Sequence, residues 1–516
     1  MATTHLMAPG HLAVNDDSAV EKLPMAVLTA MCLALVLVVA SVTAINLTLP
    51  DLALGLHASN TQLTWVADGY TVTLAALVLP LGALGDRIGR RRLLIAGAAV
   101  FAIASFFAGR VDTVEQLIGF RVAMGTGAAM IMPGTLATIT AVFPAELRSK
   151  GVAVWSGCAG AGAIFGLLVS GFVLEHSDWR MIFTISAVAA AMAGLGALIF
   201  APETRDENPP KADYFGSLFT GLSIGSLVYA IINGARRGWT DHIVIAMFVL
   251  AVVSIVAYVF TGLRTKHSVL DPRFFARRGF LTGSVTVVMQ FMAVMGFFFV
   301  GLQYLLLIRD FSPLEAAVAL LPVAGVMLPV AALTPTLLRF VSVNIATATG
   351  LFLMAGSMVY ASTLTATSSY DQFLVGLLVS GVGLGITSST GTNLIVSSLS
   401  PQQQGTASAV NDSTREVGSA VGIALMGSIF ATNYRSNLPD LSMLKPDVAT
   451  HIRDSAPSGI TITQHMGPAA ANLAEGVRTA FMHGFSTSLM IVSIFLFVGG
   501  VVTLFAPKRI PVGHGH

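Results

Sequence analysis

The sequence predicts an all-α integral membrane protein with fourteen membrane-spanning helices. Only 10% of its 516 residues are charged, whereas 54% are hydrophobic, and ordinary soluble domains carry about 25% charged residues. The apolar residues gather in fourteen runs, each with the roughly 18 or more residues that a helix needs to cross hydrocarbon. A water-soluble core could not bury so much apolar surface, and the formal charge of +2 does not indicate a nucleic-acid partner.

The fourteen runs give the expected order of the chain. Residues 1–24 form a polar tail, and the first run after them is too long for a signal-peptide core. We expect spans at 25–47, 62–83, 93–109, 117–141, 149–173, 180–200, 214–233, 242–262, 280–308, 314–338, 343–364, 372–397, 405–431 and 477–506. An even number of spans places both ends of the chain on one side.

The distribution of basic residues predicts which side that is. With the N-terminus in the cytoplasm, seventeen lysine and arginine residues fall in inner segments and nine fall outside or at outer ends. Cytoplasmic segments of membrane proteins carry the excess of positive charge. We therefore expect cytoplasmic tails at 1–24 and 507–516.

Two connections are longer and more polar than the others. Residues 202–213 are rich in proline and charge, which predicts a cytoplasmic linker after the sixth span. Residues 432–476 are too polar to span and form an outer loop. Apolar residues recur in this loop at helical spacing, namely Leu438, Leu441, Leu444, Val448 and Ile452. The spacing predicts a short amphipathic hairpin, and a disordered loop is the alternative.

The chain also contains an internal repeat. Gly134-Thr135 precedes Pro144 by the same spacing as Gly391-Thr392 precedes Pro401, at an offset of 257 residues. This offset aligns the fourth span with the twelfth, eight spans later. A duplicated six-span unit with two inserted helices explains the number, and parallel repeats of this kind are typical of transporters.

The repeat predicts the domain organisation. We expect an N-terminal six-helix bundle at 25–200 and a linker with two inserted helices at 201–279. A C-terminal six-helix bundle follows at 280–506 and includes the outer loop at 432–476. The two bundles are expected in a pseudo-twofold arrangement.

Few ionisable residues lie inside the predicted spans. They are Asp68 in span 2, Arg121 in span 4, and Asp412, Arg415 and Glu416 in span 13. Charges inside a bilayer are costly, so those that remain are functional candidates. We interpret Asp68, Arg121, Asp412 and Glu416 as proton-coupling or substrate-binding groups. The alternative is a structural role in ion pairs, for example between Asp68 and Arg121.

A dense charged segment, residues 82–92, separates spans 2 and 3. Its glycines allow two helices to approach closely at a turn, and its carboxylate lies beside arginines and near a helix end. We interpret it as a conformational latch that stabilises outward-open packing, formed by Gly82, Asp86, Arg87, Gly89 and Arg90. For Arg91 and Arg92 a purely topological role is expected.

Aromatic and methionine residues are concentrated in span 9. They are Phe291, Met292, Met295, Phe297, Phe298, Phe299 and Tyr304. They suit either a soft lining for flat lipophilic molecules or simple contact with lipid. The two cysteines, Cys32 and Cys158, fall within apolar runs, so the sequence implies neither a disulfide framework nor a metal site.

Taken together, these motifs resemble the major facilitator superfamily, specifically its fourteen-span drug:proton antiporters. Residues 82–92 resemble the superfamily's loop motif between spans 2 and 3, and Arg121 with Gly125 and Gly127 resembles its basic motif in span 4. Residues 65–70 and 405–418 resemble the start of span 2 and the span 13 segment of the fourteen-span group. The resemblance covers nearly the whole chain.

The resemblance implies a secondary active multidrug efflux transporter rather than an enzyme. It would export amphipathic, cationic drugs, biocides or dyes in exchange for protons by alternating access, as a functional monomer in the bacterial cytoplasmic membrane. Its partners would be lipophilic small molecules, protons and membrane lipids, with no cofactor. A proton-linked or uncoupled transporter of another solute, such as a lipid or metabolite, is the alternative.

Two positions depart from the family pattern. Ser41 stands where exporters of hydrophobic cations often carry an aspartate, and Leu167 replaces the proline of the span 5 motif. The glycines of that motif, Gly162, Gly166 and Gly171, remain. The chain has neither a Gly-x-x-x-x-Gly-Lys-Ser/Thr loop nor a His-Glu-x-x-His pair, which argues against an ATP-driven pump and a zinc enzyme.

Overall fold

The computed structural model describes residues 17–143, 145–204, 213–264, 271–399, 404–467 and 470–505, and every regular element within them is a helix. The first six are α1 (Asp17–Gly55), α2 (Asn60–Ile88), α3 (Arg90–Ala108), α4 (Val114–Val142), α5 (Ala145–His176) and α6 (Arg180–Phe200). Then come α7 (Tyr214–Arg237), α8 (His242–Arg264) and the 3₁₀ helix η1 (Pro272–Ala276). The remainder are α9 (Arg278–Leu307), α10 (Pro313–Ala319), α11 (Leu321–Leu337), α12 (Val343–Ser362), α13 (Tyr370–Ser397), α14 (Gln404–Ser436), α15 (Pro446–Asp454), α16 (Ala456–His465) and α17 (Ala471–Leu504).

The predicted fourteen-span fold is confirmed. In the described parts of the chain, thirteen helical stretches are long and apolar enough to cross a membrane. Helix α5, with the shorter apolar segment Gly162–His176, completes the predicted number of fourteen. Most helix ends differ from the predicted bounds by a few residues, and two differences go further. Helix α1 begins at Asp17, within the predicted tail, and the span predicted at 314–338 is divided into α10 and α11. The division falls at Leu320, close to Pro322, because a proline removes a backbone donor and crowds the preceding turn.

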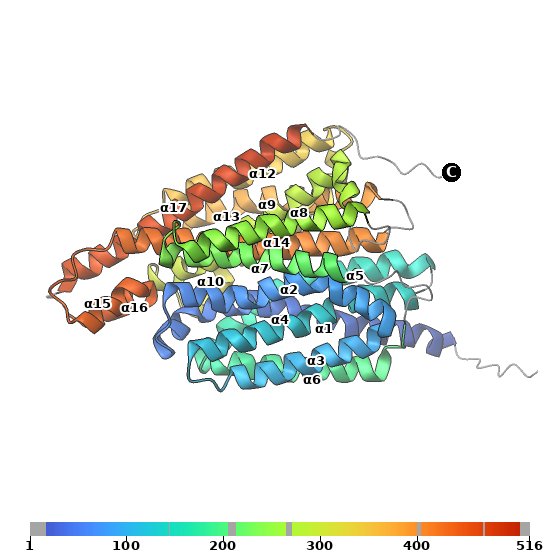
Figure 1. The fold of residues 1–516 in the computed structure, drawn as a ribbon, viewed down its shortest axis with the longest axis horizontal. Coiled ribbons are helices and arrows are strands. Elements are labelled where there is room, and N and C mark those ends of the chain that lie inside the picture. The colour runs from blue at the N-terminus through green and yellow to red at the C-terminus, as the bar shows by residue number, and fades with distance from the viewer. Residues whose placement is uncertain are drawn as a thin grey trace, which may run out of the picture.

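The same helix pairings occur in both halves of the chain. Helix α1 packs on α4, α5 and α6, and α9 packs in the same way on α13, α14 and α17. Likewise α4 packs on α2 and α3, and α13 packs on α11 and α12. These contacts form two bundles of six spans each, on the two sides of the molecule (Figure 1). The N bundle consists of α1–α6, and the C bundle consists of α9–α14 and α17, with α10 and α11 counted as one span.

Glycines set the closest contacts in both bundles. A Cβ atom at Gly166 of α5 would lie 2.6 Å from the carbonyl oxygen of Ala40 in α1. A Cβ atom at Gly418 of α14 would lie 2.5 Å from the carbonyl oxygen of Val288 in α9. Any larger side chain would therefore force the backbones apart, as expected for small-residue contacts between membrane helices.

The two inserted helices lie beside the junction of the bundles. Helix α7 packs on α2 of the N bundle and on α14 of the C bundle, while α8 packs on α7. The Ser428 hydroxyl of α14 donates a hydrogen bond to the Ile231 carbonyl oxygen of α7 at 2.7 Å. Most of the α8 surface is exposed and apolar, as expected for a helix facing lipid.

The bundles meet at the end of the molecule that carries α15 and α16, which we call the hairpin end. Helix α15 with α16 forms the helical hairpin that projects there, whereas α1 begins and α17 ends at the opposite end (Figure 1). At the hairpin end, a Cβ atom at Gly427 of α14 would lie 2.7 Å from Thr64 Oγ1 of α2. Similarly, a Cβ atom at Gly171 of α5 would lie 2.8 Å from Leu314 Cα of α10.

Candidate functional site

Asp68 lies two turns inside α2 and is completely buried. The helix begins with a capping box, in which the Ser59 hydroxyl accepts from the Gln62 amide and the Gln62 side chain accepts from the Ser59 amide. One oxygen of the Asp68 carboxyl accepts a hydrogen bond from the Thr71 hydroxyl at 2.9 Å. Its other oxygen has no hydrogen-bond partner in the described structure. The carboxyl group is therefore held in place but incompletely satisfied.

The position of Asp68 in α2 places it at the junction of the bundles. Residues four apart share a helix face, so Asp68 lies on the face that also carries Thr64 and Val72. Thr64 packs against Gly427 of α14, and Val72 belongs to an apolar cluster shared with α7 and α14. The other members of that cluster are Ala75, Ile224, Val228, Ile231, Ile232, Ala420 and Ala424. The residues one turn before and one turn after Asp68 thus contact the C bundle and α7.

Arg121 of α4 is only 1% exposed and is held by backbone oxygens. Its Nε donates to the Val66 carbonyl oxygen at 3.0 Å, and its two terminal nitrogens donate to the carbonyl oxygens of Ser41 and Ala67 at 3.4 and 3.5 Å. The guanidinium carbon lies 4.5 Å from the centre of the Tyr70 ring. Carbonyl dipoles and an aromatic face therefore compensate this buried charge.

The ion pair between Asp68 and Arg121, which was the structural alternative for these residues, is not formed. No carboxylate within the described ranges lies within 4.0 Å of the Arg121 guanidinium. The two charged groups lie in one bundle but have separate surroundings. Asp68 is therefore a buried acid without a neighbouring counter-ion.

The charged residues of α14 form a second group. Asp412 is buried, and its carboxylate lies 3.9 Å from the Arg415 guanidinium. The Arg415 guanidinium also lies 4.7 Å from the centre of the Phe291 ring of α9. Glu416 follows Asp412 by one helical turn and is half-buried on the same face. Two acids and one basic residue therefore lie close together on α14, with Arg415 paired to Asp412.

Tyr70 lies beside Arg121 and within electrostatic range of Glu416. Its hydroxyl donates to the Val38 carbonyl oxygen at 3.0 Å, and its ring lies beside the Arg121 guanidinium. The charge of the Glu416 carboxylate, on α14, acts on this tyrosine at longer range. Sequence reasoning did not assign a role to Tyr70. Its position two residues after Asp68, in the segment that resembles the start of span 2, was the available signal.

The charged segment at 82–92 lies at the end opposite the hairpin. Asp86 pairs with Arg90 at 2.8 Å, and Gly89 has a φ of 115°, which a residue with a side chain rarely adopts. Arg92 pairs with Glu203 at 3.4 Å. A Cβ atom at Gly82 would lie 3.2 Å from the Pro133 side chain of α4, while Arg87 is exposed. In this state the Asp86 carboxylate is engaged within its own segment.

The glycines of the span 5 motif lie at two different helix contacts. Gly162 and Gly166 pack against Val36 and Ala40 of α1. Gly171 lies against Leu314 of α10, and so joins the two bundles at the hairpin end. Close approach is therefore maintained where Leu167 replaces the expected proline.

Five of the seven span 9 residues do not face lipid, and Phe291 and Phe298 are partly exposed. Met292, Met295, Phe297, Phe299 and Tyr304 are buried within the protein rather than facing lipid. The Phe297 and Tyr304 rings both stack on Phe373 of α13, with centroids 5.8 Å apart in each case. These side chains pack the interior of the C bundle. A helix within a bundle and a helix facing lipid are both apolar, so composition alone does not separate them.

Comparison with known proteins gives consistent matches along the chain. The profile of the Major Facilitator Superfamily matches residues 31–423. The chain is 29% identical to the multidrug efflux pump LfrA of Mycolicibacterium smegmatis, over 93% of this chain and 96% of the relative. It is 27% identical to the tetracenomycin C resistance and export protein of Streptomyces glaucescens, over 99% and 97%. The methyl viologen resistance protein SmvA of Salmonella typhimurium is 29% identical, over 87% and 91%.

A solved structure supports the same fold. A bacterial homologue of the human lysosomal transporter Spinster, in an inward-facing and unoccupied conformation, superposes with a TM-score of 0.67 at 17% identity. The superposition covers 93% of this chain and 98% of that structure. At this identity the match concerns the fold alone.

Proposed function

Because the chain belongs to the Major Facilitator Superfamily, we propose that it is a secondary active multidrug exporter that exchanges protons for amphipathic, cationic compounds. Three relatives are named for multidrug efflux, for tetracenomycin C export and for methyl viologen resistance, which supports drug export. The observation that carries proton exchange is Asp68, a completely buried carboxyl group without a counter-ion at the junction of the bundles.

Asp68 is the proposed primary proton carrier. An ionised carboxylate without a counter-ion is costly in a low-dielectric interior. Its charge state therefore depends on whether water reaches it from the cytoplasmic or the outer side. As the bundles rock, Asp68 would release a proton on one side of the membrane and accept one on the other.

The groups around Tyr70 are the proposed partners of Asp68 in substrate binding and coupling. Arg121 fastens α4 to the backbones of α1 and α2, so it orients the helix that carries Asp68. Asp412 and Glu416 supply negative charge from the C bundle, where a cationic compound would replace Arg415 as their partner. Charges from both bundles would then act on one bound molecule.

The segment at 82–92 is the proposed latch, with Gly82, Asp86, Arg87, Gly89 and Arg90 as its residues. Its glycines permit the tight turn between α2 and α3, and Asp86 supplies the negative charge. We propose that Asp86 exchanges its bond with Arg90 for a helix terminus of the C bundle when this end closes in the outward-open state.

The proposed setting is a monomer in the bacterial cytoplasmic membrane with both termini in the cytoplasm. The excess of lysine and arginine in the corresponding segments supports this orientation. The hairpin end then faces the outside. Protons and lipophilic small molecules are the transported partners, with membrane lipids as the surroundings.

A second candidate is a proton-linked or uncoupled transporter of another solute, such as a lipid or metabolite. The position next to Arg121 favours it, because Ser41 supplies a carbonyl oxygen there and its hydroxyl donates back to Leu37. The site thus has no acid at residue 41 to attract a cation.

Transport in inverted membrane vesicles tests these alternatives. The vesicles would carry an imposed, inside-acidic pH gradient, and proton release would be recorded on addition of cationic, neutral or anionic lipophilic compounds. Methyl viologen and a monovalent cationic dye are suitable cations, with vesicles lacking the protein as the control. Release with the cations supports the proposal. Release only with a neutral metabolite, or none at all, would overturn it.

A further inference from the structure

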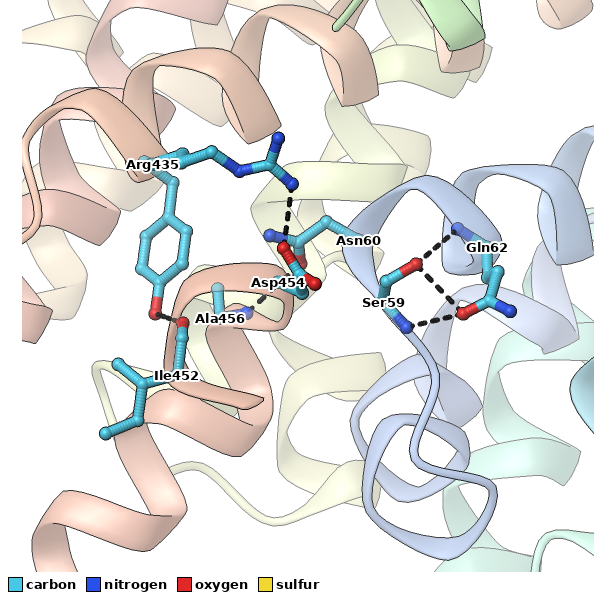
Figure 2. A network of polar contacts seen from close by, with 8 residues as sticks. Ser59, Asn60, Gln62, Arg435, Ile452, Asp454 and Ala456 are labelled. Atoms are coloured by element: carbon cyan, nitrogen blue, oxygen red, sulfur yellow. Dashed lines mark hydrogen bonds and ion pairs between the residues drawn. The ribbon is translucent and has the colours of Figure 1, made fainter. Parts of the chain in front are cut away.

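The helical hairpin is firmly attached to the C bundle. The Tyr434 hydroxyl of α14 donates to the Ile452 carbonyl oxygen at 2.8 Å. Arg435 pairs with Asp454 at 2.9 Å (Figure 2). Ile452 and Ile460 are almost completely buried, and α16 packs on α17. Burial of apolar surface together with polar contacts makes this side of the hairpin a continuous part of the C bundle.

The attachment of the hairpin to the N bundle is less extensive: α16 packs on α1, though less than on α17, and polar contacts join it to α2 and to the α1–α2 connection. The Ala456 amide of α16 donates to the Asn60 Oδ1 of α2 at 3.1 Å (Figure 2). The rings of His57 and His451 are in edge contact, with centroids 5.6 Å apart. A cavity of about 230 Å³ lies beside these contacts, lined mainly by polar side chains of the α1–α2 connection, α2, α14 and α15.

Both partners of the hydrogen bond between Ala456 and Asn60 are fixed by local structure. Asn60 is the first residue of α2 and follows the Ser59 cap, so its side chain starts from a rigid helix end. Ala456 is the first residue of α16, where a backbone N–H has no partner within its own helix. Asn60 thus supplies the acceptor that this helix end lacks.

We propose that Asn60 is a positioning residue for transport and that it holds the helical hairpin as an outer gate. The hairpin moves with the C bundle and separates from the N bundle when the pathway opens to the outside. Asn60 and Asp68 lie on one helix, so release of the gate and exposure of the buried acid involve the same helix. This proposal rests on the alternating access proposed above.

The hairpin is attached to both bundles, and the difference between the two attachments decides which one separates when the pathway opens. On the N-bundle side, water in the adjoining cavity can replace the hydrogen bond between Ala456 and Asn60 when the contact opens. On the C-bundle side, separation would break the hydrogen bond between Tyr434 and Ile452, the ion pair of Arg435 with Asp454 and the more extensive packing of α16 on α17. The N-bundle contact is therefore the one that opens.

Cross-linking of each contact provides a matched test. The chain has only two cysteines, so Cys32→Ser with Cys158→Ser gives a cysteine-free background. Into it are introduced either Asn60→Cys with Ala456→Cys, across the proposed gate, or Arg435→Cys with Asp454→Cys, within the C-bundle attachment. A short, reducible thiol cross-linker closes each pair, and efflux is measured before and after reduction.

The two pairs have opposite expected outcomes. Closing the gate pair should reduce efflux at least tenfold, with recovery on reduction, whereas closing the attachment pair should leave efflux within twofold. The proposal is overturned if the gate pair transports when cross-linked, or if both pairs stop transport. A cysteine-free protein that shows no proton-driven efflux before cross-linking would instead contradict the proposed function.

Variants of Asn60 separate gating from a merely structural role. Thr61→Cys in the cysteine-free background places a reporter thiol at a buried position beside the cavity. Asn60→Leu removes the acceptor and should raise labelling by a membrane-impermeant maleimide at least threefold. Asn60→Asp keeps an acceptor oxygen and should stay within twofold of the parent rate. Equal labelling of all three proteins would overturn the assignment of Asn60.

Discussion

Replacement of Asp68 by asparagine is the most direct test of proton coupling. The amide has nearly the shape of the carboxyl group and can still accept the Thr71 hydrogen bond, which measures 2.9 Å. The added amide donor would be buried where the carboxyl oxygen has no partner among the described residues. The cost of such a group is about 1–3 kcal/mol, so Asp68→Asn should be less stable but still fold.

The transport defect of Asp68→Asn should be specific to the driving force. Each proton exchanged down a gradient of one pH unit supplies about 1.4 kcal/mol, a factor of about ten in the substrate ratio that can be maintained. A variant that exchanges one proton fewer should lose that factor, whereas downhill substrate exchange should continue. Both are measured in vesicles containing equal amounts of folded protein.

Thr71→Val is the matched control for Asp68→Asn. It removes the only hydrogen bond described for the Asp68 carboxyl from another side chain but leaves the protonatable group in place. We expect it to retain the tenfold dependence of accumulation on each pH unit. If Asp68→Asn maintained the same substrate ratio as the parent protein at the same gradient, the role of Asp68 as proton carrier would be refuted.

Three further substitutions test the packing, the basic centre and the latch. Gly166→Ala should destabilise the protein by about 1–3 kcal/mol, because the new Cβ would lie 2.6 Å from the Ala40 carbonyl oxygen. Gly225 has open space around it, so Gly225→Ala is the neutral control, and both variants are compared by thermal unfolding. Arg121→Lys replaces a forked donor with a compact one. The free energy of unfolding should fall by about 1.5–3 kcal/mol for each charged hydrogen bond that is lost, and an unchanged melting temperature would contradict this prediction. Asp86→Asn breaks a partly exposed ion pair with Arg90, so the free energy of unfolding should change by less than about 1 kcal/mol. Efflux should nevertheless fall severalfold, and normal efflux would argue against the latch.

The number and order of the spans could be predicted because length and hydropathy largely decide whether a segment enters a membrane. The break in span 10 could also have been predicted from the sequence, since Pro322 disfavours helical geometry in the residue before it. The partners of Arg121 could not be predicted from the sequence, because its main acceptors are backbone carbonyl oxygens and these have no sequence signature. Likewise, Tyr70 and Glu416 are distant in sequence and come within electrostatic range of each other only when the bundles are assembled.

The repeat explains why packing and charge follow different patterns. Gly125 meets the Tyr70 carbonyl oxygen in the N bundle, and Gly381 meets the Val323 carbonyl oxygen in the C bundle, so the same helix contact is built twice. These contacts set offsets of 256 residues between α4 and α13 and 253 residues between α2 and α11, slightly different from the 257 of the sequence repeat. In this register Arg121 corresponds to Leu377 and Asp68 corresponds to Leu321.

Each buried charge of the N bundle therefore has an apolar counterpart in the C bundle. A charge required for folding a six-helix unit would be needed in both copies, since both use the same contacts. Because the unit packs without these charges in its second copy, their cost in the first is better explained by transport than by stability. Under the proposed exchange, the acids of α14 would give the C bundle its own contribution, and proton exchange would require both bundles.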